Sequence, residues 1–147
     1  RDPRPMNQRE AEGWVREAVK APYASELFEL EVVSVAPGAV VLALAHQRQF
    51  EHQPGWFQGA ITTAIGEYAA SYAAATSAES GAANLTLSQV IHFVGPARGD
   101  RLIAEAKVIA PGRSITYARA DIYVEEAGAR RLCASLTLTM RHALPRA

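Results

Sequence analysis

The most informative segment of the sequence is QGAITTAIGEYAASYAAATS, residues 58–77. Helix-forming residues outnumber helix breakers in it, and Gly81 lies just beyond its end, so it predicts one long α-helix. The stretch is small and apolar nearly all round, which is typical of a buried helix. Glu67 is the only formally charged residue between Glu51 and Glu79, so a carboxylate lies near the centre of a predicted buried helix.

Shorter patterns flank this helix on both sides. Upstream, residues 7–20 have helical spacing up to Pro22, and two strands are predicted at 28–35 and 40–46 with Pro37-Gly38 as their turn, before a loop over 47–57. Downstream, four strands are predicted at 85–94, 102–109, 116–125 and 132–140. The last two alternate strictly, and the predicted core-facing residues are Ala118, Ala120, Ile122, Val124, Leu132, Ala134, Leu136, Leu138 and Met140.

The element order lacks the β-α-β-α alternation of a doubly wound sheet. It favours an α+β fold in which one antiparallel sheet wraps around the long central helix. Such a sheet covers only part of an apolar helix, so a second chain is expected to cover the rest, which predicts a dimer. We interpret residues 1–147 as a single domain, in which residues 1–5 are an expression remnant or a processed end.

Composition excludes several classes of function. Fifteen basic and fifteen acidic side chains cancel, which argues against a nucleic-acid partner. The sequence has one cysteine, so no disulfide within the chain is predicted. No set of Cys and His residues has the spacing of zinc ligands, so no metal site is predicted. Polar residues interrupt the apolar stretch, so no membrane span is predicted, and without a signal-peptide pattern the default expectation is a cytoplasmic protein.

Glu67 has two interpretations. It either lies on a thin exposed edge of the helix, or faces a cavity and acts as a base or nucleophile. Thr63 and Ser71 lie four residues before and after it, so the three share one face. Ser71 can then hydrogen-bond the carboxylate or a water beside it, although Ser and Thr also bond back to helix carbonyls.

The start of the helix is the second candidate feature. Its first backbone N–H groups lack internal partners, and Gly59 would let a substrate carbonyl come close to one of them. Alternatively, Gly55 and Gly59 serve only the turn. Gly59 and Glu67 are eight residues apart, roughly 12 Å along a helix, so they cannot meet within one chain. Across an antiparallel pair of helices they can.

The run HQPGWFQGA, residues 52–60, followed by Glu67 resembles the active-site motif of the hotdog-fold acyl-CoA thioesterases, in particular the PaaI-like and 4-hydroxybenzoyl-CoA thioesterase group. That motif is Asn-x-x-Gly-x-x-His-Gly-Gly with an Asp or Glu nine residues after the His. The resemblance implies a hotdog fold paired into a homodimer or homotetramer, with its active site at the helix–helix interface. By position, Gly59 is the oxyanion donor, Glu67 the base or nucleophile, and Ser71 a residue that holds the carboxylate or water.

Three positions depart from the motif. His52 replaces the usual Asn or Gln, Gln58 the usual His, and Ala60 the second Gly. Gln58 can donate a hydrogen bond to the thioester carbonyl but cannot carry a proton at neutral pH. His52 either recovers part of that role or is a solvated loop residue. The predicted catalytic residues are Glu67, Gly59, Gln58, His52 and Ser71.

Coenzyme A carries phosphates, so its binding requires local positive charge. Arg98 lies in one predicted turn, and Arg113-Ser114 lies in another whose type often contacts coenzyme A in related thioesterases. Trp56, Phe57, Tyr68 and Tyr72 are candidates for an acyl or aryl pocket, with core packing as the alternative for Tyr72. The predicted substrate-binding residues are Gly55, Trp56, Phe57, Ala60, Thr63, Tyr68, Arg98, Arg113 and Ser114.

The favoured function is hydrolysis of an acyl-CoA or aroyl-CoA, with no cofactor because coenzyme A is part of the substrate. The leaving thiolate is stable, so a site without His at position 58 needs no strong general acid. A non-catalytic acyl-CoA binder or sensor is the first alternative, supported by the missing His. A hotdog enoyl-CoA hydratase or dehydratase is the second, with His52 as its only plausibly placed histidine.

Overall fold

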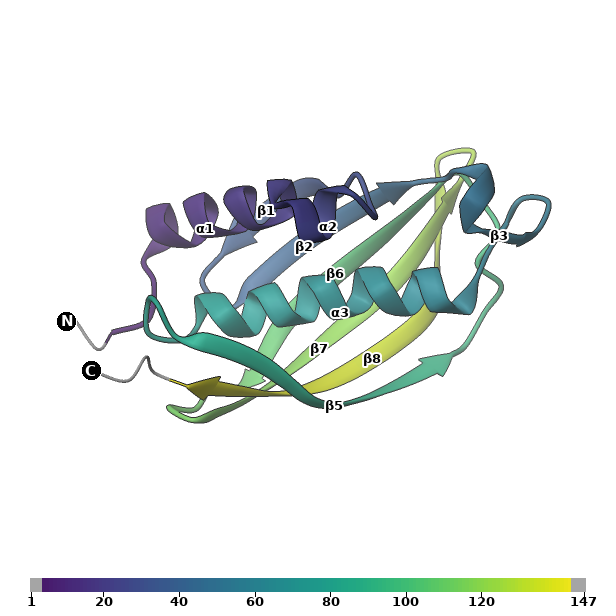
Figure 1. Cartoon of the computed structure of the whole chain (residues 1–147). Helices are drawn as coiled ribbons and strands as arrows, with labels where there is room; N and C mark the ends of the chain where they lie inside the picture. The colour runs from purple at the N-terminus through teal and green to yellow at the C-terminus, as the bar shows by residue number, and fades with distance from the viewer. Residues whose placement is uncertain (1–3, 144–147) are drawn as a thin grey trace.

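The structure is a computed structural model that describes residues 4–143. Helix α3 lies in the middle of the molecule, with the sheet curving around it and α1 beside the first strands (Figure 1). The helical elements are α1 (Gln8–Lys20), α2 (Pro22–Ser25), the 3-10 turn η1 (Arg48–Phe50) and α3 (Gly59–Thr76). The strands are β1 (Glu31–Ala36), β2 (Ala39–Ala45), β3 (Glu51–Gln53), β4 (Trp56–Phe57), β5 (Ala83–Phe93), β6 (Arg101–Ala110), β7 (Ile115–Glu126) and β8 (Ala129–Ala143).

Six strands form one antiparallel sheet in the order β1-β2-β6-β7-β8-β5, and β3 and β4 form a separate small hairpin. Helix α3 packs against β2, β6, β7 and β8. This confirms the α+β prediction of an antiparallel sheet wrapped around one long helix. Strand β5 follows α3 in sequence yet returns to the far edge of the sheet, where it pairs with β8, the last strand (Figure 1).

Small residues bring α3 close to the sheet. A Cβ added at Gly66 would lie 2.9 Å from Ile122 Cδ1, closer than van der Waals contact allows. Ala69, Ala70 and Ala73 are fully buried in the same interface. The alanine-rich composition that predicted a buried helix therefore has a packing reason, because larger side chains would push α3 off the sheet.

The predicted alternation holds along β7 and most of β8, where Ala118, Ala120, Ile122 and Leu136 are fully buried. The prediction is wrong at the start of β8. Leu132 is 41% exposed, whereas its neighbour Cys133 is buried. The register shifts at this point, with Ile122 paired to Ala134 and Tyr123 paired to Leu132, so Cys133 forms a bulge. A bulge inserts one extra residue into a strand, so the side chains that precede it in the strand point to the opposite face of the sheet from the one that strict alternation predicts.

Strand β8 (Ala129–Ala143) extends beyond the predicted 132–140 at both ends, and two segments upstream of α3 differ more from the prediction. Strand β1 begins at Glu31 rather than at residue 28, because Pro22 opens the short helix α2 and the chain stays irregular until residue 30. Phe28 instead packs against the rings of Phe50 and Tyr68. The loop predicted over 47–57 contains η1 and the β3–β4 hairpin.

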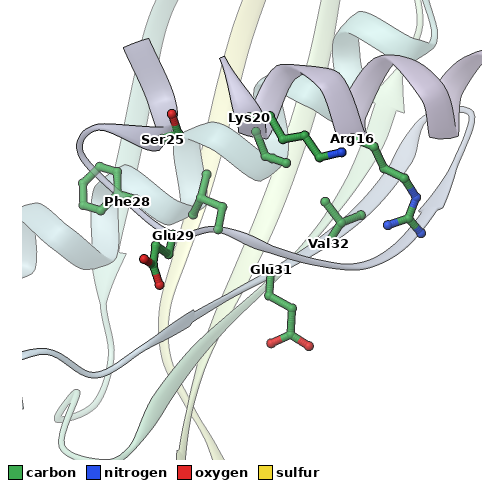
Figure 2. Close-up of a pocket in the computed structure, with 9 residues that line it drawn as sticks. Arg16, Lys20, Ser25, Phe28, Glu29, Glu31 and Val32 are labelled. Carbon is green, nitrogen blue, oxygen red and sulfur yellow. The ribbon is translucent and has the colours of Figure 1, made fainter. Parts of the chain in front are cut away.

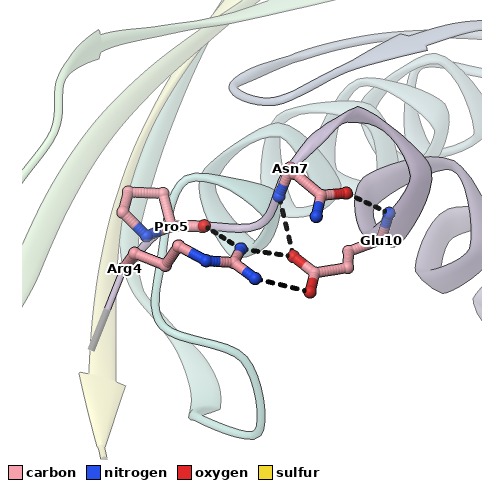
Figure 3. A network of polar contacts seen from close by, with 4 residues as sticks. All are labelled: Arg4, Pro5, Asn7 and Glu10. Carbon is pink, nitrogen blue, oxygen red and sulfur yellow. Dashed lines mark hydrogen bonds and ion pairs between the residues drawn. The ribbon is translucent and has the colours of Figure 1, made fainter. Parts of the chain in front are cut away.

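Helix α1 starts at a complete capping box. Glu10 N donates to Asn7 Oδ1, and Asn7 N donates to the Glu10 carboxylate, which Arg4 also contacts at 2.7 Å (Figure 3). Hydrogen bonds from Arg4 and then Asn7 lower the pKa of Glu10 to about 2. Pro5 forms a bridge to Glu79. Arg4 and Pro5, interpreted from sequence as part of a terminal remnant, are thus placed against the domain, and residues 1–3 lie outside the described range.

A buried histidine ties the β6–β7 turn to the sheet. His142 Nδ1 lies 2.6 Å from Asn84 Oδ1, and its Nε2 lies 2.7 Å from Thr116 Oγ1. Gly112 N donates to the same Thr116 hydroxyl at 3.2 Å. With Asn84 as an acceptor, the neutral imidazole donates from Nδ1 and accepts from Thr116, and burial lowers the pKa of His142.

Candidate active site

The amino end of α3 is open to solvent. Its N-cap residue, Gln58, makes no side-chain capping bond, and the first turn contains no acidic residue. Gly59 and Ala60 are exposed. Ile61 N and Thr62 N already donate to the Gln58 carbonyl, so the backbone N–H groups of Gly59 and Ala60 and the positive end of the helix dipole remain available to an anionic oxygen. The ring of Phe93 lies 3.3 Å from where a Cβ at Gly59 would be, so glycine is also favoured there by packing.

Gln58 has a structural role in this conformation. Its Nε2 donates to the carbonyls of Gln49 (3.2 Å) and Glu51 (3.3 Å), which fastens the β3–β4 hairpin to the start of α3. These two bonds occupy both hydrogens of the carboxamide. The predicted donation to a thioester carbonyl would require one of them to be exchanged.

The sequence did not reveal a second contact that holds the hairpin. His46 Nε2 lies within ion-pair distance of Glu51 Oε1, at 3.0 Å, and the same oxygen accepts from Gly55 N at 3.3 Å. Gly55 has φ +83°, a conformation that favours glycine. His52, on the same hairpin, is exposed and lies 6.0 Å from the Trp56 ring. No motif links His46 to Glu51, because their approach depends on the fold.

Glu67 lies half-buried in the middle of α3 and does not belong to the fully buried face of the helix, which includes Ile65, Gly66 and Ala69. Gln89 on β5 donates a hydrogen bond to its Oε2 at 3.2 Å. Of the two hydroxyls predicted to share its face, Thr63 bonds back to the Gly59 carbonyl at 2.8 Å. The Ser71 hydroxyl has no hydrogen-bond partner within residues 4–143, so it is available to a water or ligand.

A cavity of about 420 Å³ lies beside Glu67. Helix α3 contributes one wall and the segment around α2 the other, and the lining residues are Tyr23, Leu27, Phe28, Ala64, Glu67, Tyr68, Ser71 and Tyr72. Burial raises the pKa of Tyr68 and of Tyr72, and for Tyr68 the Glu67 carboxylate adds to the rise. Both phenols are therefore neutral at pH 7. The cavity combines one carboxylate with an otherwise uncharged, largely aromatic lining.

Tyr23, Leu27 and Phe28 were not predicted as site residues, because only the fold of the α2 segment brings them to α3. Trp56 and Phe57, predicted as pocket candidates, do not line this cavity. Phe57 is buried against the His46 ring, and Trp56 forms a bridge to Arg98. Both belong to the hairpin at the amino end of α3.

The arginines predicted to bind coenzyme A lie at opposite ends of α3. Arg98 is exposed next to the hairpin, 4.0 Å from the Glu126 carboxylate. Arg113 borders a cavity of about 620 Å³ near Ser77 and Ala78, at the other end of the helix. Ser114 accepts a backbone bond from His142 N. A helix of 18 residues spans about 27 Å, so Arg98 and Arg113 do not converge within one chain.

A further hollow of about 540 Å³ lies between α1 and β1 (Figure 2). Arg16 and Lys20 line one side of it, and Glu29 and Glu31 the other (Figure 2). It contains none of the predicted site residues. Its opposite charges give it no preference for anions or cations.

The described residues provide no metal centre, since residues 4–143 contain no group of three or more His, Cys, Asp or Glu side chains that could hold an ion. In the same part of the chain, no helix has both the length and the apolar character needed to cross a membrane.

Comparison with known proteins identifies the family. The model of the thioesterase superfamily matches residues 56–130, which include the amino end of α3 and Glu67. This chain belongs to the thioesterase superfamily. The matched region covers half of the sequence, from the β3–β4 hairpin to the start of β8.

Solved structures agree with the superfamily assignment. A thioesterase family protein from Silicibacter pomeroyi is 28% identical, with a TM-score of 0.87 over 92% of this chain and 99% of that one. PaaI of the phenylacetic acid degradation operon of E. coli has a TM-score of 0.78 at 17% identity, over 90% of this chain and 92% of that one. The Haemophilus influenzae thioesterase HI1161 has a TM-score of 0.76 at 21% identity, with 87% of each chain covered. No curated protein sequence matches the chain.

The chain therefore has the hotdog thioesterase fold, as the sequence predicted, and PaaI of E. coli shares this fold. Superfamily membership supports thioester hydrolysis as the general activity.

Proposed function

We propose that this superfamily member hydrolyses an acyl-CoA or aroyl-CoA thioester, with Glu67 as base or nucleophile. The observation that carries the proposal is the position of Glu67 in the wall of a 420 Å³ cavity whose lining is otherwise uncharged. A carboxylate beside such a cavity is placed to act on a bound carbonyl rather than to stabilise the fold. The Ser71 hydroxyl in the same wall, which has no hydrogen-bond partner in the described part of the chain, supports a water-binding role.

In the proposed reaction, Glu67 removes a proton from water and the hydroxide adds to the carbonyl carbon. Negative charge develops on the carbonyl oxygen and is stabilised by the Gly59 N–H at the open amino end of α3. Collapse breaks the C–S bond, releasing the coenzyme A thiolate and the carboxylic acid. Direct attack by the Glu67 carboxylate, followed by hydrolysis of the anhydride, gives the same products.

We further propose that each site is shared by two chains. Gly59 and Glu67 lie about 12 Å apart along α3, whereas both groups must reach one carbonyl. The edge strand β5 supports a partner, because its large apolar side chains Leu85, Leu87, Val90 and Phe93 are each more than half exposed. An apolar strand edge of this length is an expected pairing surface. A two-fold arrangement would set Glu67 of one chain near Gly59 of the other.

The test of Glu67 is thiol release from a panel of acyl- and aroyl-CoAs. Glu67→Gln keeps the size of the side chain and removes its basicity, so kcat is expected to fall about 10²- to 10⁴-fold. Glu17→Gln on the exposed face of α1 is the matched control and should leave kcat unchanged. Glu67→Gln with wild-type activity on the best substrate would end the proposal.

The shared site is tested by mixing two inactive variants. Glu67→Gln and Gly59→Val each abolish both sites of a homodimer, but a mixed dimer contains one intact site. Equal mixing after refolding should restore about a quarter of wild-type activity, since half of the dimers are mixed and each has one working site. Gly59→Ala serves if the valine variant does not fold. No recovery, with mixed dimers shown by mass spectrometry, would exclude a shared site.

One observation favours a second candidate, a non-catalytic acyl-CoA binder. The Gln58 carboxamide donates both of its hydrogens to the carbonyls of Gln49 and Glu51, and position 58 offers no acid. Calorimetric binding of an acyl-CoA without release of thiol would support this function instead of hydrolysis.

A further inference from the structure

The cavity beside Glu67 has a wall that comes from outside the thioesterase motif. Tyr23, Leu27 and Phe28 belong to the segment between α1 and β1, and they line the cavity together with Ala64, Tyr68 and Tyr72 of α3. In Figure 1 this segment lies alongside the middle of α3, where Glu67 is located. The superfamily match begins only at residue 56, so the wall lies outside the matched region.

The segment is held firmly at its base. Ala24 is fully buried, and its carbonyl accepts from the backbone N–H groups of Leu27 (3.1 Å) and Phe28 (2.9 Å). The Phe28 ring lies 5.7 Å from Phe50 and 5.9 Å from Tyr68, at tilted and edge-on angles favourable for aromatic pairs. The backbone that carries Tyr23 and Leu27 is therefore fixed relative to α3.

The two side chains on this fixed backbone remain in solvent. Tyr23 is 71% exposed and Leu27 is 64% exposed, although both line the cavity. Large apolar side chains gathered at the rim of a concave site are typical of ligand contact rather than of fold stability. Neither makes a side-chain hydrogen bond or ion pair within residues 4–143.

The chemistry of the lining limits what it can receive. Glu67 is the one charged residue among the described residues that border the cavity, and no Lys, Arg or His lies there. The phosphates of coenzyme A would find no cation and would meet the carboxylate. An uncharged apolar group is suited to aromatic and aliphatic walls, and a volume of 420 Å³ is within the range of small-molecule sites.

We propose that Tyr23 and Leu27 are specificity-determining residues that hold the apolar acyl group of the thioester against Tyr68 and Tyr72. The inference rests on the proposed hydrolysis at Glu67, because that reaction requires the acyl carbonyl to lie beside Glu67, at the mouth of the same cavity. Acyl groups that reach both walls bury Tyr23 and Leu27 on binding. An acetyl group is too short to reach them.

The experiment measures kcat/KM for hexanoyl-CoA, benzoyl-CoA and acetyl-CoA with the protein of residues 1–147. Tyr23→Ala and Leu27→Ala should each lower kcat/KM for hexanoyl-CoA or benzoyl-CoA about ten-fold, mainly through KM, while acetyl-CoA changes less than about two-fold. Leu27→Trp, which narrows the cavity, should shift the preference toward acetyl-CoA. Because both positions are exposed, these variants are expected to fold.

Tyr117→Ala and Leu132→Ala are matched controls, since they make the same changes at exposed strand positions outside the cavity. If Glu67→Gln abolishes hydrolysis but the Tyr23 and Leu27 variants keep wild-type selectivity, this inference is wrong and the proposed function stands. If no thioester is hydrolysed, the proposed function fails. The role of Tyr23 and Leu27 in holding the acyl group is then tested by measuring the affinities for the same acyl-CoAs by calorimetry. Equal acyl-CoA affinities in the wild type and in the Tyr23 and Leu27 variants, or no binding at all, would overturn this role.

Discussion

The network around His142 gives the most direct test of the packing described above. His142→Ala removes contacts at 2.6 Å to Asn84 and 2.7 Å to Thr116 and leaves a space in a site that is 6% exposed. Two hydrogen bonds contribute about 1 kcal/mol each, and the lost packing adds about 1 kcal/mol or more. We therefore expect a loss of about 3 kcal/mol in the free energy of unfolding, which corresponds to roughly 6–12 °C in Tm.

The same residue gives a pH dependence of known sign. Burial lowers the pKa of His142 in the folded protein, so the folded state favours the neutral ring. The stabilisation by His142 is fully present above the unfolded pKa, about 6.5, and is lost as the pH falls from there toward the lower folded pKa. The carboxylates that titrate in this range are the same in the wild type and in His142→Ala, so their contributions cancel in the difference between the two free energies of unfolding. The stability gap between wild type and His142→Ala should thus narrow between pH 7 and pH 5.

Urea unfolding followed by circular dichroism at several pH values is the appropriate assay. His52→Ala, which truncates an exposed histidine, is the control and should change stability by less than about 0.5 kcal/mol. A loss below about 1 kcal/mol for His142→Ala at pH 7.5, or a gap that widens as the pH falls, would refute the assignment of His142 as a neutral, doubly bonded core residue.

Three further predictions concern single positions. Gly13→Ala in α1 meets no atom within 4 Å and should raise the free energy of unfolding by about 0.5–1 kcal/mol in a urea titration, whereas a decrease would indicate an unseen contact. Gly99→Ala would place a Cβ 2.3 Å from the Glu125 carbonyl oxygen at φ +158°, so Tm should fall by at least about 5 °C. Burial raises the pKa of the Cys133 thiol to about 11, so the native protein should not react with a thiol reagent at pH 8, while the unfolded protein reacts at one thiol per chain.

Much of the fold was predictable because it follows from local pattern. The strict alternation of β7 identified its buried face, and the small apolar run of α3 identified the central helix. The bulge at Cys133 was not predictable, since it depends on how β8 pairs with β7. The late start of β1 was missed for a similar reason, because Phe28 is held by ring contacts with Phe50 and Tyr68 rather than by strand pairing.

The candidate site divides in the same way. A lone carboxylate in an apolar helix singled out Glu67 without any coordinates, because an unpaired buried charge is unfavourable and needs an explanation. The sequence could not show that Gln58 fastens the hairpin, or that His46 lies beside Glu51.

The central helix, its carboxylate and the glycine at its amino end could be located from the residue pattern alone, because helix periodicity fixes which residues share a face. What lies opposite that face depends on the packing of the folded chain. In the folded chain, Tyr23 and Leu27 line the same cavity as Glu67, whereas Arg98 and Arg113 lie at opposite ends of α3. These neighbours come from distant segments, and their approach depends on how the whole chain packs rather than on any local pattern.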